Sequence, residues 1–281
     1  MTTVPLLRLR MTGIAAAILA IVIAGLVSGA PVGAQTPPGP VSRFPASPFA
    51  IVAAPAQYEV YQTVLEFRPG AKTREHTHGG PEFVTVVEGQ LTRIKDGVET
   101  LFLPGQTFRE EQGTFFTVAN MGTLTARAFA TILLSPGQPV TLNHPDRPVP
   151  GQVPTAVSVS RTTVGTQPAE FSLIQQIIDF APGAYAPRHR HNGVVLISQL
   201  SGTILTRVGD AEIRQTAGGT YLENEGIAAD HRNVGQETAT VVVTFLVPRG
   251  RPPAMAEPSA PPAQAVVPQI LPPRTGDGGL R

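Results

Sequence analysis

Short runs of apolar and β-branched residues, broken by glycine and proline, fill most of the chain between residues 58 and 247. The two longest, Tyr58–Phe67 and Phe171–Phe180, are each followed within three residues by a Pro-Gly pair. Runs of this composition between turn residues are typical of strands. Asp96-Gly97 between two further runs predicts a hairpin. No window sustains the 3.6-residue period of an amphipathic helix, so the pattern predicts an all-β protein.

The pattern repeats itself at an offset of 113 residues without a gap, so that about 58–134 falls on 171–247. Chance similarity between glycine-rich segments would not keep one register for so long. We therefore predict a tandem duplication, with all-β domains at 58–138 and 169–249, each of ordinary domain size. The repeated pairs include Gly70 and Gly183, His76 and His189, His78 and His191, Gly105 and Gly218, and Asn120 and Asn233.

Proline-rich segments surround the two repeats. Residues 35–57 and 139–168 are predicted to be linkers, because proline, alanine and serine are abundant in the first and prolines recur through the second. Residues 250–281 contain repeated prolines and are predicted to be a disordered tail, since such a segment cannot bury enough apolar surface to offset its ordering entropy.

The amino terminus has the pattern of an export signal. Arg8 and Arg10 precede an apolar run from Ile14 to Val27, and small residues follow up to Ala34. This predicts a signal peptide over residues 1–34 and a secreted or periplasmic protein without membrane association after cleavage. An uncleaved membrane anchor is the alternative, because the run is close to spanning length. The sequence contains no cysteine, so the exported domains would be held by their cores without disulfides.

Charge and composition exclude several functions. The chain has 21 lysines and arginines against 20 aspartates and glutamates, a formal net charge of +1. A nucleic-acid partner is not expected, because the sequence shows no basic patch or stripe. Cysteine and the G-x-S-x-G motif are both absent, so neither a thiol nor a serine-hydrolase nucleophile is indicated. The candidate chemistry lies with the histidines.

His76 and His78 stand two positions apart in the first repeat, and Glu82 follows after Gly79-Gly80-Pro81. Residues two apart on a strand point to the same side. Two imidazoles in a barrel interior would be costly with nothing to bind, and the carboxylate could reach them from the next strand. Two imidazoles and one carboxylate form the facial set used for Fe(II), which also suits Mn, Ni or Zn. The alternative is a surface histidine pair beside an unrelated glutamate.

The spacing Gly70-x5-His76-x-His78-x3-Glu82-x6-Gly89 resembles the first conserved motif of the cupin superfamily. The stretch from Leu103 to Asn120 resembles the second, with Phe116 in the place of its histidine. This resemblance covers both repeats and implies a bicupin, in which each jelly-roll barrel has room for one metal in its mouth. In the first domain it implies three protein ligands, with Phe116 and Phe83 as pocket residues.

The second repeat departs from this pattern. It keeps His189 and His191, but Val195 stands in the place of the glutamate and Ala229 in the place of the phenylalanine. His231 lies two residues after Ala229, so on one strand the two side chains would point to the same side. His231 would then become a third ligand. Three imidazoles suit Zn, Cu, Fe or Ni, with Val195 and Ala229 as pocket residues. The alternative is that this domain has lost its metal.

The resemblance implies a metal-dependent oxidoreductase of the dioxygenase type, since exported bicupins include quercetinase-type dioxygenases and oxalate-handling enzymes. The phenylalanines favour a small, aromatic or hydrophobic organic substrate. The expected cofactor is one divalent transition metal (Fe, Mn, Ni, Cu or Zn) in the first domain, with a second metal in the second domain as an open alternative. No catalytic residue beyond the ligands is assigned. The rival function is a non-catalytic ligand-binding or structural cupin with one or both metal sites decayed. The expected partner is a small molecule, and a homo-oligomer remains open.

Overall fold

The computed structural model describes residues 37–46, 48–51, 57–165 and 167–257. The predicted signal peptide, residues 1–34, and residues 258–281 of the predicted tail lie outside these ranges. All regular structure in the described ranges is β-strand, which confirms the predicted all-β class. Within these ranges, no helix has the length and apolarity needed to cross a membrane.

The first domain is a barrel of antiparallel strands, formed by one large sheet and two smaller ones. The large sheet has the order β12-β3-β10-β5-β8, and the smaller sheets are β7-β6-β9 and β11-β4. Phe67, Val84, Leu91, Phe116 and Ala128 are buried together between them. The strands are β3 (Tyr58–Phe67), β4 (His76–Thr77), β5 (Glu82–Glu88), β6 (Leu91–Lys95), β7 (Val98–Phe102), β8 (Thr107–Glu110), β9 (Thr117–Ala119), β10 (Ala126–Leu134), β11 (Leu142–Asn143) and β12 (Thr155–Val164).

The second domain repeats this arrangement. One sheet has the order β1-β13-β20-β15-β18, with β2 also paired to β13, and the other has the order β17-β16-β19-β14-β21. Phe180, Val195, Ile204, Val241 and Phe245 form its core. The strands are β1 (Val41–Ser42), β2 (Pro48–Ile51), β13 (Phe171–Phe180), β14 (Tyr185–His191), β15 (Val194–Ser201), β16 (Thr203–Val208), β17 (Ala211–Thr216), β18 (Thr220–Glu223), β19 (Ala228–Asn233), β20 (Ala239–Pro248) and β21 (Ala254–Ala256).

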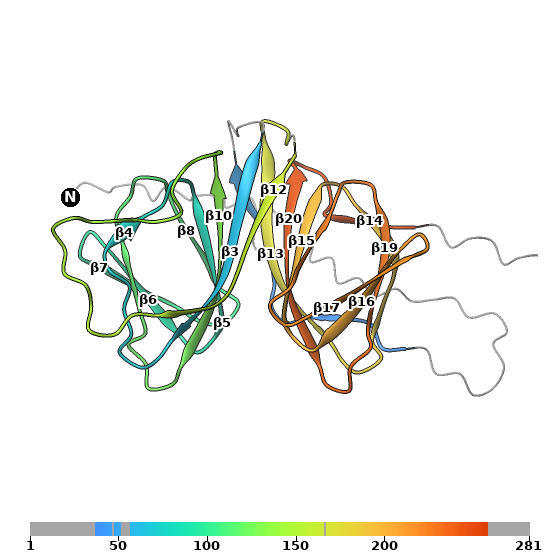
Figure 1. The fold of residues 1–281 in the computed structure, drawn as a ribbon, viewed down its shortest axis with the longest axis horizontal. Helices are drawn as coiled ribbons and strands as arrows, with labels where there is room; N and C mark the ends of the chain where they lie inside the picture. The colour runs from blue at the N-terminus through green and yellow to red at the C-terminus, as the bar shows by residue number, and fades with distance from the viewer. Residues whose placement is uncertain (1–36, 47, 52–56, 166, 258–281) are drawn as a thin grey trace, which may run out of the picture.

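The large sheets of the two domains face each other in the middle of the molecule (Figure 1). Strand β5 shows why both of its faces are apolar: Val84 and Val86 point into the first barrel, whereas Phe83 and Val87 pack toward the second domain. Alternate residues of a strand point to opposite faces, so one strand contributes to two cores. The domain interface is therefore a hydrophobic core in its own right.

A buried polar network lies inside this interface and repeats the internal symmetry of the chain. Gln62 Nε2 donates to Thr131 Oγ1 at 3.2 Å and to Thr244 Oγ1 at 3.0 Å. Gln175, the repeat counterpart of Gln62, donates to Thr131 Oγ1 at 2.9 Å and accepts from the Thr85 hydroxyl at 3.2 Å. Because buried amides are costly when unpaired, this network holds the two domains in one register.

Strands β2 and β12 are exchanged between the domains. Strand β2 precedes β3 along the chain but pairs with β13, placing Ile51 opposite Phe171. Strand β12 precedes β13 but pairs with β3, placing Val164 opposite Tyr58. These two pairs are related by the 113-residue offset. In each domain, the strand that precedes the repeat therefore pairs with the first strand of the other domain.

The exchange changes the interpretation of the predicted linkers. Residues 35–57 include β1 and β2, and residues 139–168 include β11 and β12, so both segments contribute strands to the sheets. Within the predicted tail, residues 254–256 form β21, which pairs with β14. Proline at the borders of these segments is tolerated because β2 and β12 lie at the edges of their sheets.

Candidate metal centre

His76, His78 and Glu82 come together in the first barrel. His76 lies on β4, His78 follows this strand, and Glu82 begins β5. The two imidazole rings meet edge to face with centroids 4.9 Å apart. All three residues are buried, and each offers a ligand atom within 4.8 Å of the others. The side chains thus converge as the strand period and the sequence spacing predict, and they could hold a metal ion.

The Gly-Gly pair before Glu82 has a steric role. A Cβ on Gly80 would lie 1.9 Å from the carbonyl oxygen of Leu133, on the neighbouring strand β10. Gly193 occupies the same place in the second domain, where a Cβ would lie 2.1 Å from the carbonyl oxygen of Leu246. Only glycine permits this close approach of the backbones, which brings β5 and β15 into the sheet directly after the histidine pair.

Both imidazoles are oriented by backbone carbonyl groups. His76 Nδ1 lies 2.7 Å from Arg74 O, and His78 Nδ1 lies 2.6 Å from Val140 O. A carbonyl oxygen only accepts, so in each neutral ring Nδ1 carries the hydrogen and Nε2 carries a lone pair. This is the arrangement by which metal-binding histidines are held.

His78 Nε2 lies 3.1 Å from Glu82 Oε2. Because the nitrogen lone pair and the carboxylate are both acceptors, this contact is stable only with a cation or a proton between them. Two ligand atoms at right angles, each about 2.1 Å from one ion, are about 3.0 Å apart. The observed separation therefore fits a metal ion.

The electrostatics of the pair agree with this. Burial lowers the pKa of His76, and neighbouring His78 lowers it further. Burial would also lower the pKa of His78, but the adjacent Glu82 carboxylate, together with Val140 O and Glu110, outweighs burial and raises it. Positive charge is thus favoured between His78 and Glu82, and a second protonated ring is disfavoured.

Phe116 covers one side of the two imidazoles. Its ring centroid lies 4.5 Å from that of His76 and 5.7 Å from that of His78. The backbones of Phe116 and His76 exchange two hydrogen bonds of 3.0 Å. Phe116 is buried and excludes water from this side. It therefore lies beside the histidines, where a pocket residue was predicted.

Phe83 does not line the site. It belongs to the core between the domains and packs on Phe49 with ring centroids 5.3 Å apart. The pocket prediction for Phe83 is corrected, because adjacent residues of a strand face opposite ways and Glu82 takes the inward position. Phe115 likewise points elsewhere, against the ring of His144.

Glu110 is a buried carboxylate that the motif analysis missed. It lies opposite Glu82 on neighbouring strand β8 and is 1% exposed. Arg93 Nη1 lies 3.3 Å from its Oε1. Burial raises the pKa of Glu110, and the charge of Glu82 adds to this, against the opposing effect of Arg93 and Lys95.

The second barrel brings His189, His191 and His231 together. The ring centroid of His189 lies 4.7 Å from that of His191 and 5.4 Å from that of His231. Ala229 lies opposite His189 across β14 and β19, and Val195 is part of the barrel core. His231 thus faces the other two histidines, as its spacing predicts. Their role as ligands remains a prediction, since among the described residues only the first group has all its ligand atoms within 4.8 Å.

Glu223 completes the second cluster and was also missed. It is the repeat counterpart of Glu110 and lies opposite Val195 on strand β18. Its Oε2 lies 3.2 Å from His191 Nε2, and its Oε1 lies 3.4 Å from His231 Nε2. The signal that could have found it is the repeat itself, which places a glutamate five residues after Gly105 and after Gly218.

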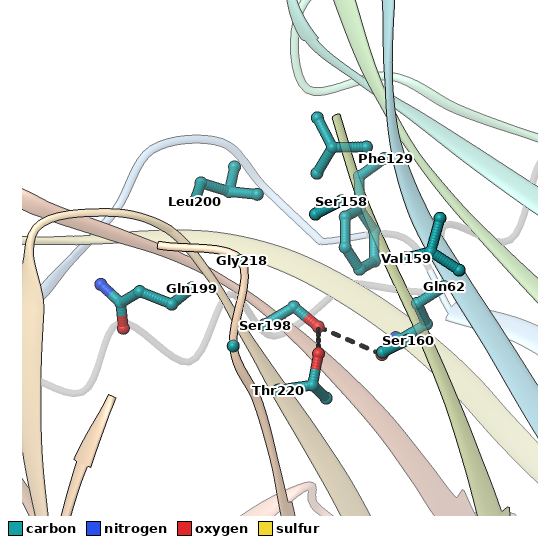
Figure 2. Close-up of a pocket in the computed structure, with 12 residues that line it drawn as sticks. Gln62, Phe129, Ser158, Val159, Ser160, Ser198, Gln199, Leu200, Gly218 and Thr220 are labelled. Atoms are coloured by element: carbon teal, nitrogen blue, oxygen red, sulfur yellow. Dashed lines mark hydrogen bonds between the residues drawn. The ribbon is translucent and has the colours of Figure 1, made fainter. Parts of the chain in front are cut away.

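A small pocket lies between the domains, away from both histidine clusters. In Figure 2 the Ser198 hydroxyl contacts Gln62 and Thr220 in this pocket, at 3.1 and 3.2 Å. Phe129 and Leu200 contribute apolar walls. Its interior has room for about one water molecule, so it does not suit an organic substrate.

Comparison with known proteins agrees with this architecture. The family described as Cupin domain matches twice, over residues 63–132 and 176–245. These ranges are also related by 113 residues. No curated protein is significantly similar to the chain.

Several solved structures resemble the chain at low sequence identity, and the first of the following has a TM-score above 0.5. Bacillus subtilis oxalate decarboxylase, in a structure concerned with its Mn(II) centres, is 12% identical with a TM-score of 0.52 over 80% of each chain. AerE from Microcystis aeruginosa is 15% identical with a TM-score of 0.47, over 71% of this chain and 97% of that one. A mutant of salicylate 1,2-dioxygenase from Pseudoaminobacter salicylatoxidans is 11% identical with a TM-score of 0.42, over 66% and 70%. With its tandem barrels, its paired motifs and two domain matches, the chain belongs to the cupin superfamily and is a bicupin.

Proposed function

We propose that this bicupin is a metal-dependent oxidoreductase of the dioxygenase type, acting outside the cytoplasm on a small organic molecule. The observation that carries the proposal is the convergence of His76, His78 and Glu82, with both Nδ1 atoms held by carbonyl groups. Three protein ligands leave positions open for substrate and dioxygen, as catalytic metal sites require. A bound transition metal would polarise the substrate and activate dioxygen.

The surrounding residues would shape the reaction. Phe116 lies against both imidazoles, excludes water and offers an apolar face to a substrate, which favours an aromatic or hydrophobic molecule. Glu110, on the strand beside Glu82, has a raised pKa because it is buried. Its carboxyl group therefore keeps a proton to a higher pH than an ordinary glutamate and could hold one beside the site.

The test is oxygen consumption by the metal-loaded protein with a panel of phenolic substrates, with oxalate as the non-aromatic comparison. Glu82→Ala should lower the metal affinity of the first site and the rate by at least about 100-fold, because an inner ligand counts for more than an outer-shell partner. Glu88→Ala is the matched control, since this glutamate ends the same strand and is exposed. Full activity in Glu82→Ala would refute the assignment.

A non-catalytic metal-binding module is the competing function, and Phe116 in the place of a fourth ligand is the observation that favours it. Tightly held metal, removed by Glu82→Ala, without turnover of any tested substrate would support this alternative. Export is tested separately by determining the amino-terminal residue of the protein recovered outside the cytoplasm. Cleavage after Ala34 is the expected result, and an intact amino terminus held in the membrane fraction would contradict it.

A further inference from the structure

The connection from β10 to β12 is bound to the histidine-bearing segment of the first domain. It passes beside β4, on the side of the first barrel that faces away from the second domain (Figure 1). Residues 138–147 of this connection, which we call the strap, lie along residues 74–79, and the short strand β11 within the strap pairs with β4 in antiparallel register. A segment that the sequence predicts to be a linker is therefore attached to the residues that form the first site.

One end of the strap reaches the candidate ligand His78. Gly79 N donates to Pro139 O at 3.1 Å. The next carbonyl oxygen along the strap, that of Val140, lies 2.6 Å from His78 Nδ1. A Cβ on Gly79 would lie 2.3 Å from Pro139 O, so glycine is needed for the two backbones to approach this closely. The orientation of the His78 ring therefore depends on the position of the strap.

Arg74 holds the other end of the strap. Its Nη2 donates to His144 O at 2.7 Å and to Pro145 O at 3.0 Å. The backbone of the same strap residue is bound as well, since His144 N donates to Glu75 O at 2.8 Å. A charged donor makes stronger hydrogen bonds than a neutral one, so the guanidinium group is a strong attachment at this end.

Two further contacts at this end are weaker. Arg147 Nε lies 2.6 Å from Glu75 Oε2, but the arginine side chain is 59% exposed, and exposed ion pairs contribute little. The ring of His144 packs against that of Phe115 with centroids 4.8 Å apart. The Arg74 side chain is therefore the attachment whose removal should affect the strap most.

The second domain repeats the strap without this arginine. Strand β21 lies along β14, and Pro253 O lies 3.2 Å from His191 Nδ1. Pro253 follows Val140 by 113 residues, so the two carbonyl groups are equivalent in the repeat. Pro187 stands in the place of Arg74. The contact between carbonyl and imidazole is thus 2.6 Å in the domain that has the arginine and 3.2 Å in the domain that lacks it.

We propose that Arg74 is a positioning residue for the first metal site, which holds the strap so that Val140 O orients His78. An imidazole without a partner at Nδ1 can present either nitrogen, and loss of an outer-shell partner lowers metal affinity about 10- to 100-fold. Because coupling is reciprocal, metal binding should also hold the strap more firmly. The inference rests on the metal binding proposed for His76, His78 and Glu82, and it does not depend on the oxygen chemistry.

The test combines metal affinity with hydrogen exchange on the full-length protein. Competition with a fluorescent chelator gives the affinity for Mn(II), and the same titration of Glu82→Ala supplies the background to subtract. Arg74→Ala should weaken binding at least about tenfold and speed the exchange of backbone amides in the strap. Arg147→Ala should weaken binding at most about fivefold, because its ion pair is exposed. In wild-type protein, added Mn(II) should slow the exchange of the strap.

Arg127→Ala is the matched control, because this partly buried arginine of the same domain contacts Glu88 and not the strap. It should leave both the affinity and the exchange unchanged. Arg74→Lys keeps one charged donor and should restore part of the affinity, which keeps the test decisive if Arg74→Ala does not fold.

Unchanged affinity in folded Arg74→Ala, or strap exchange in wild-type protein that Mn(II) does not slow, would overturn the inference while leaving metal binding by the first site in place. Wild-type protein that binds no more Mn(II) than Glu82→Ala would overturn both the inference and the metal site on which it rests.

Discussion

At the scale of single residues, the role of each clustered histidine depends on what its Nδ1 contacts. All five have this nitrogen near an oxygen atom, four near backbone carbonyls and one near a threonine hydroxyl. Each Nε2 is consequently directed to the cluster centre before any ion binds. Such preorganisation reduces the ordering cost of binding and raises ligand basicity.

Phe116 determines how many ligands the first site can offer. Because its ring lies 4.5 Å from that of His76, an imidazole at this position would reach the same centre. We predict that Phe116→His tightens metal binding by at least about tenfold, the scale at which even outer-shell partners change affinity. Competition against a fluorescent chelator measures this directly.

Phe115→His provides the control for that substitution. This neighbouring ring packs on His144 with a centroid distance of 4.8 Å and points away from the site, so the added imidazole should leave the metal affinity unchanged. Equal tightening in both variants would show that an extra histidine acts non-specifically. No tightening in Phe116→His would show that position 116 does not face the ion.

At the scale of elements, an ion pair links the segment around β1 to the second domain. Arg43, which follows β1, donates two hydrogen bonds to Asp179 on β13, at 2.7 and 2.9 Å. Thr240 Oγ1 also donates to this carboxylate at 2.8 Å. Partial burial would raise the pKa of Asp179, but these donors outweigh it and lower the pKa below its ordinary value of 3.8.

This pair predicts a pH dependence of stability. A lowered pKa means that the unfolded chain binds the proton more readily, so the stabilisation is present above the unfolded pKa near 3.8. It is lost as the pH falls through the folded pKa. Asp179→Asn should cost about 1 kcal/mol at pH 7, because the pair is partly exposed, and the difference from wild type should shrink as the pH is lowered below 3.8. Urea unfolding at pH 7 and at a series of pH values below 3.8 measures this difference.

Asp210→Asn, in an exposed hairpin of the same domain, is the control for general charge effects and should leave the stability unchanged throughout this pH series. A cost for Asp179→Asn that stays the same throughout the pH series would contradict the proposed ionic origin.

Much of this architecture follows from local pattern. The runs Tyr58–Phe67 and Phe171–Phe180 are strands with these same bounds, because β-branched residues between turn signals leave few alternatives. The 113-residue repeat predicted the duplication. The same alternation shows that Phe83 and Glu82, as neighbours on one strand, point to opposite faces of the sheet. The assignment of Phe83 to the site was therefore an error that strand geometry could have prevented.

What local pattern could not predict depends on partners distant in sequence. Strands β2 and β12 lie in proline-rich segments and are ordered by pairing with the other domain. No property of either segment alone identifies that partner. Glu223 is a second example. In the sequence it cannot be distinguished from a surface glutamate, and only the pairing of β18 with β15 places it opposite Val195. Only the comparison with Glu110 in the first repeat marks the position.

At the scale of the whole molecule, the two domains are joined by contacts that repeat with the internal duplication of the chain. They share an apolar core, exchange leading strands, and join through amides of equivalent residues. Neither barrel buries its large sheet without the other. The domains should therefore unfold together in a single cooperative transition.

The interfacial glutamines test this unity. Gln175→Leu removes the amide acceptor of the Thr85 hydroxyl, which keeps only Thr107 as a partner, and removes one donor to Thr131. Gln62→Leu removes the donor to Thr244. We predict that each destabilises the protein by about 1–3 kcal/mol, the cost of stranding buried polar groups. The loss of unfolding free energy in the double variant should differ from the sum of the two single losses, because both glutamines contact Thr131. Denaturant unfolding followed by circular dichroism, and by release of metal from the first domain, measures the effect.

Gln176→Leu is the matched control, because this adjacent side chain bonds Ser42 on the exposed face and takes no part in the interface network. It should change stability by no more than about 0.5 kcal/mol. The decisive observation is the shape of the denaturant unfolding curve. If the two domains unfold as one unit, an interfacial substitution lowers the unfolding midpoint of both domains to the same extent. Two separate transitions, of which only one moves, would show that each barrel is stable alone and that the exchanged strands merely connect them.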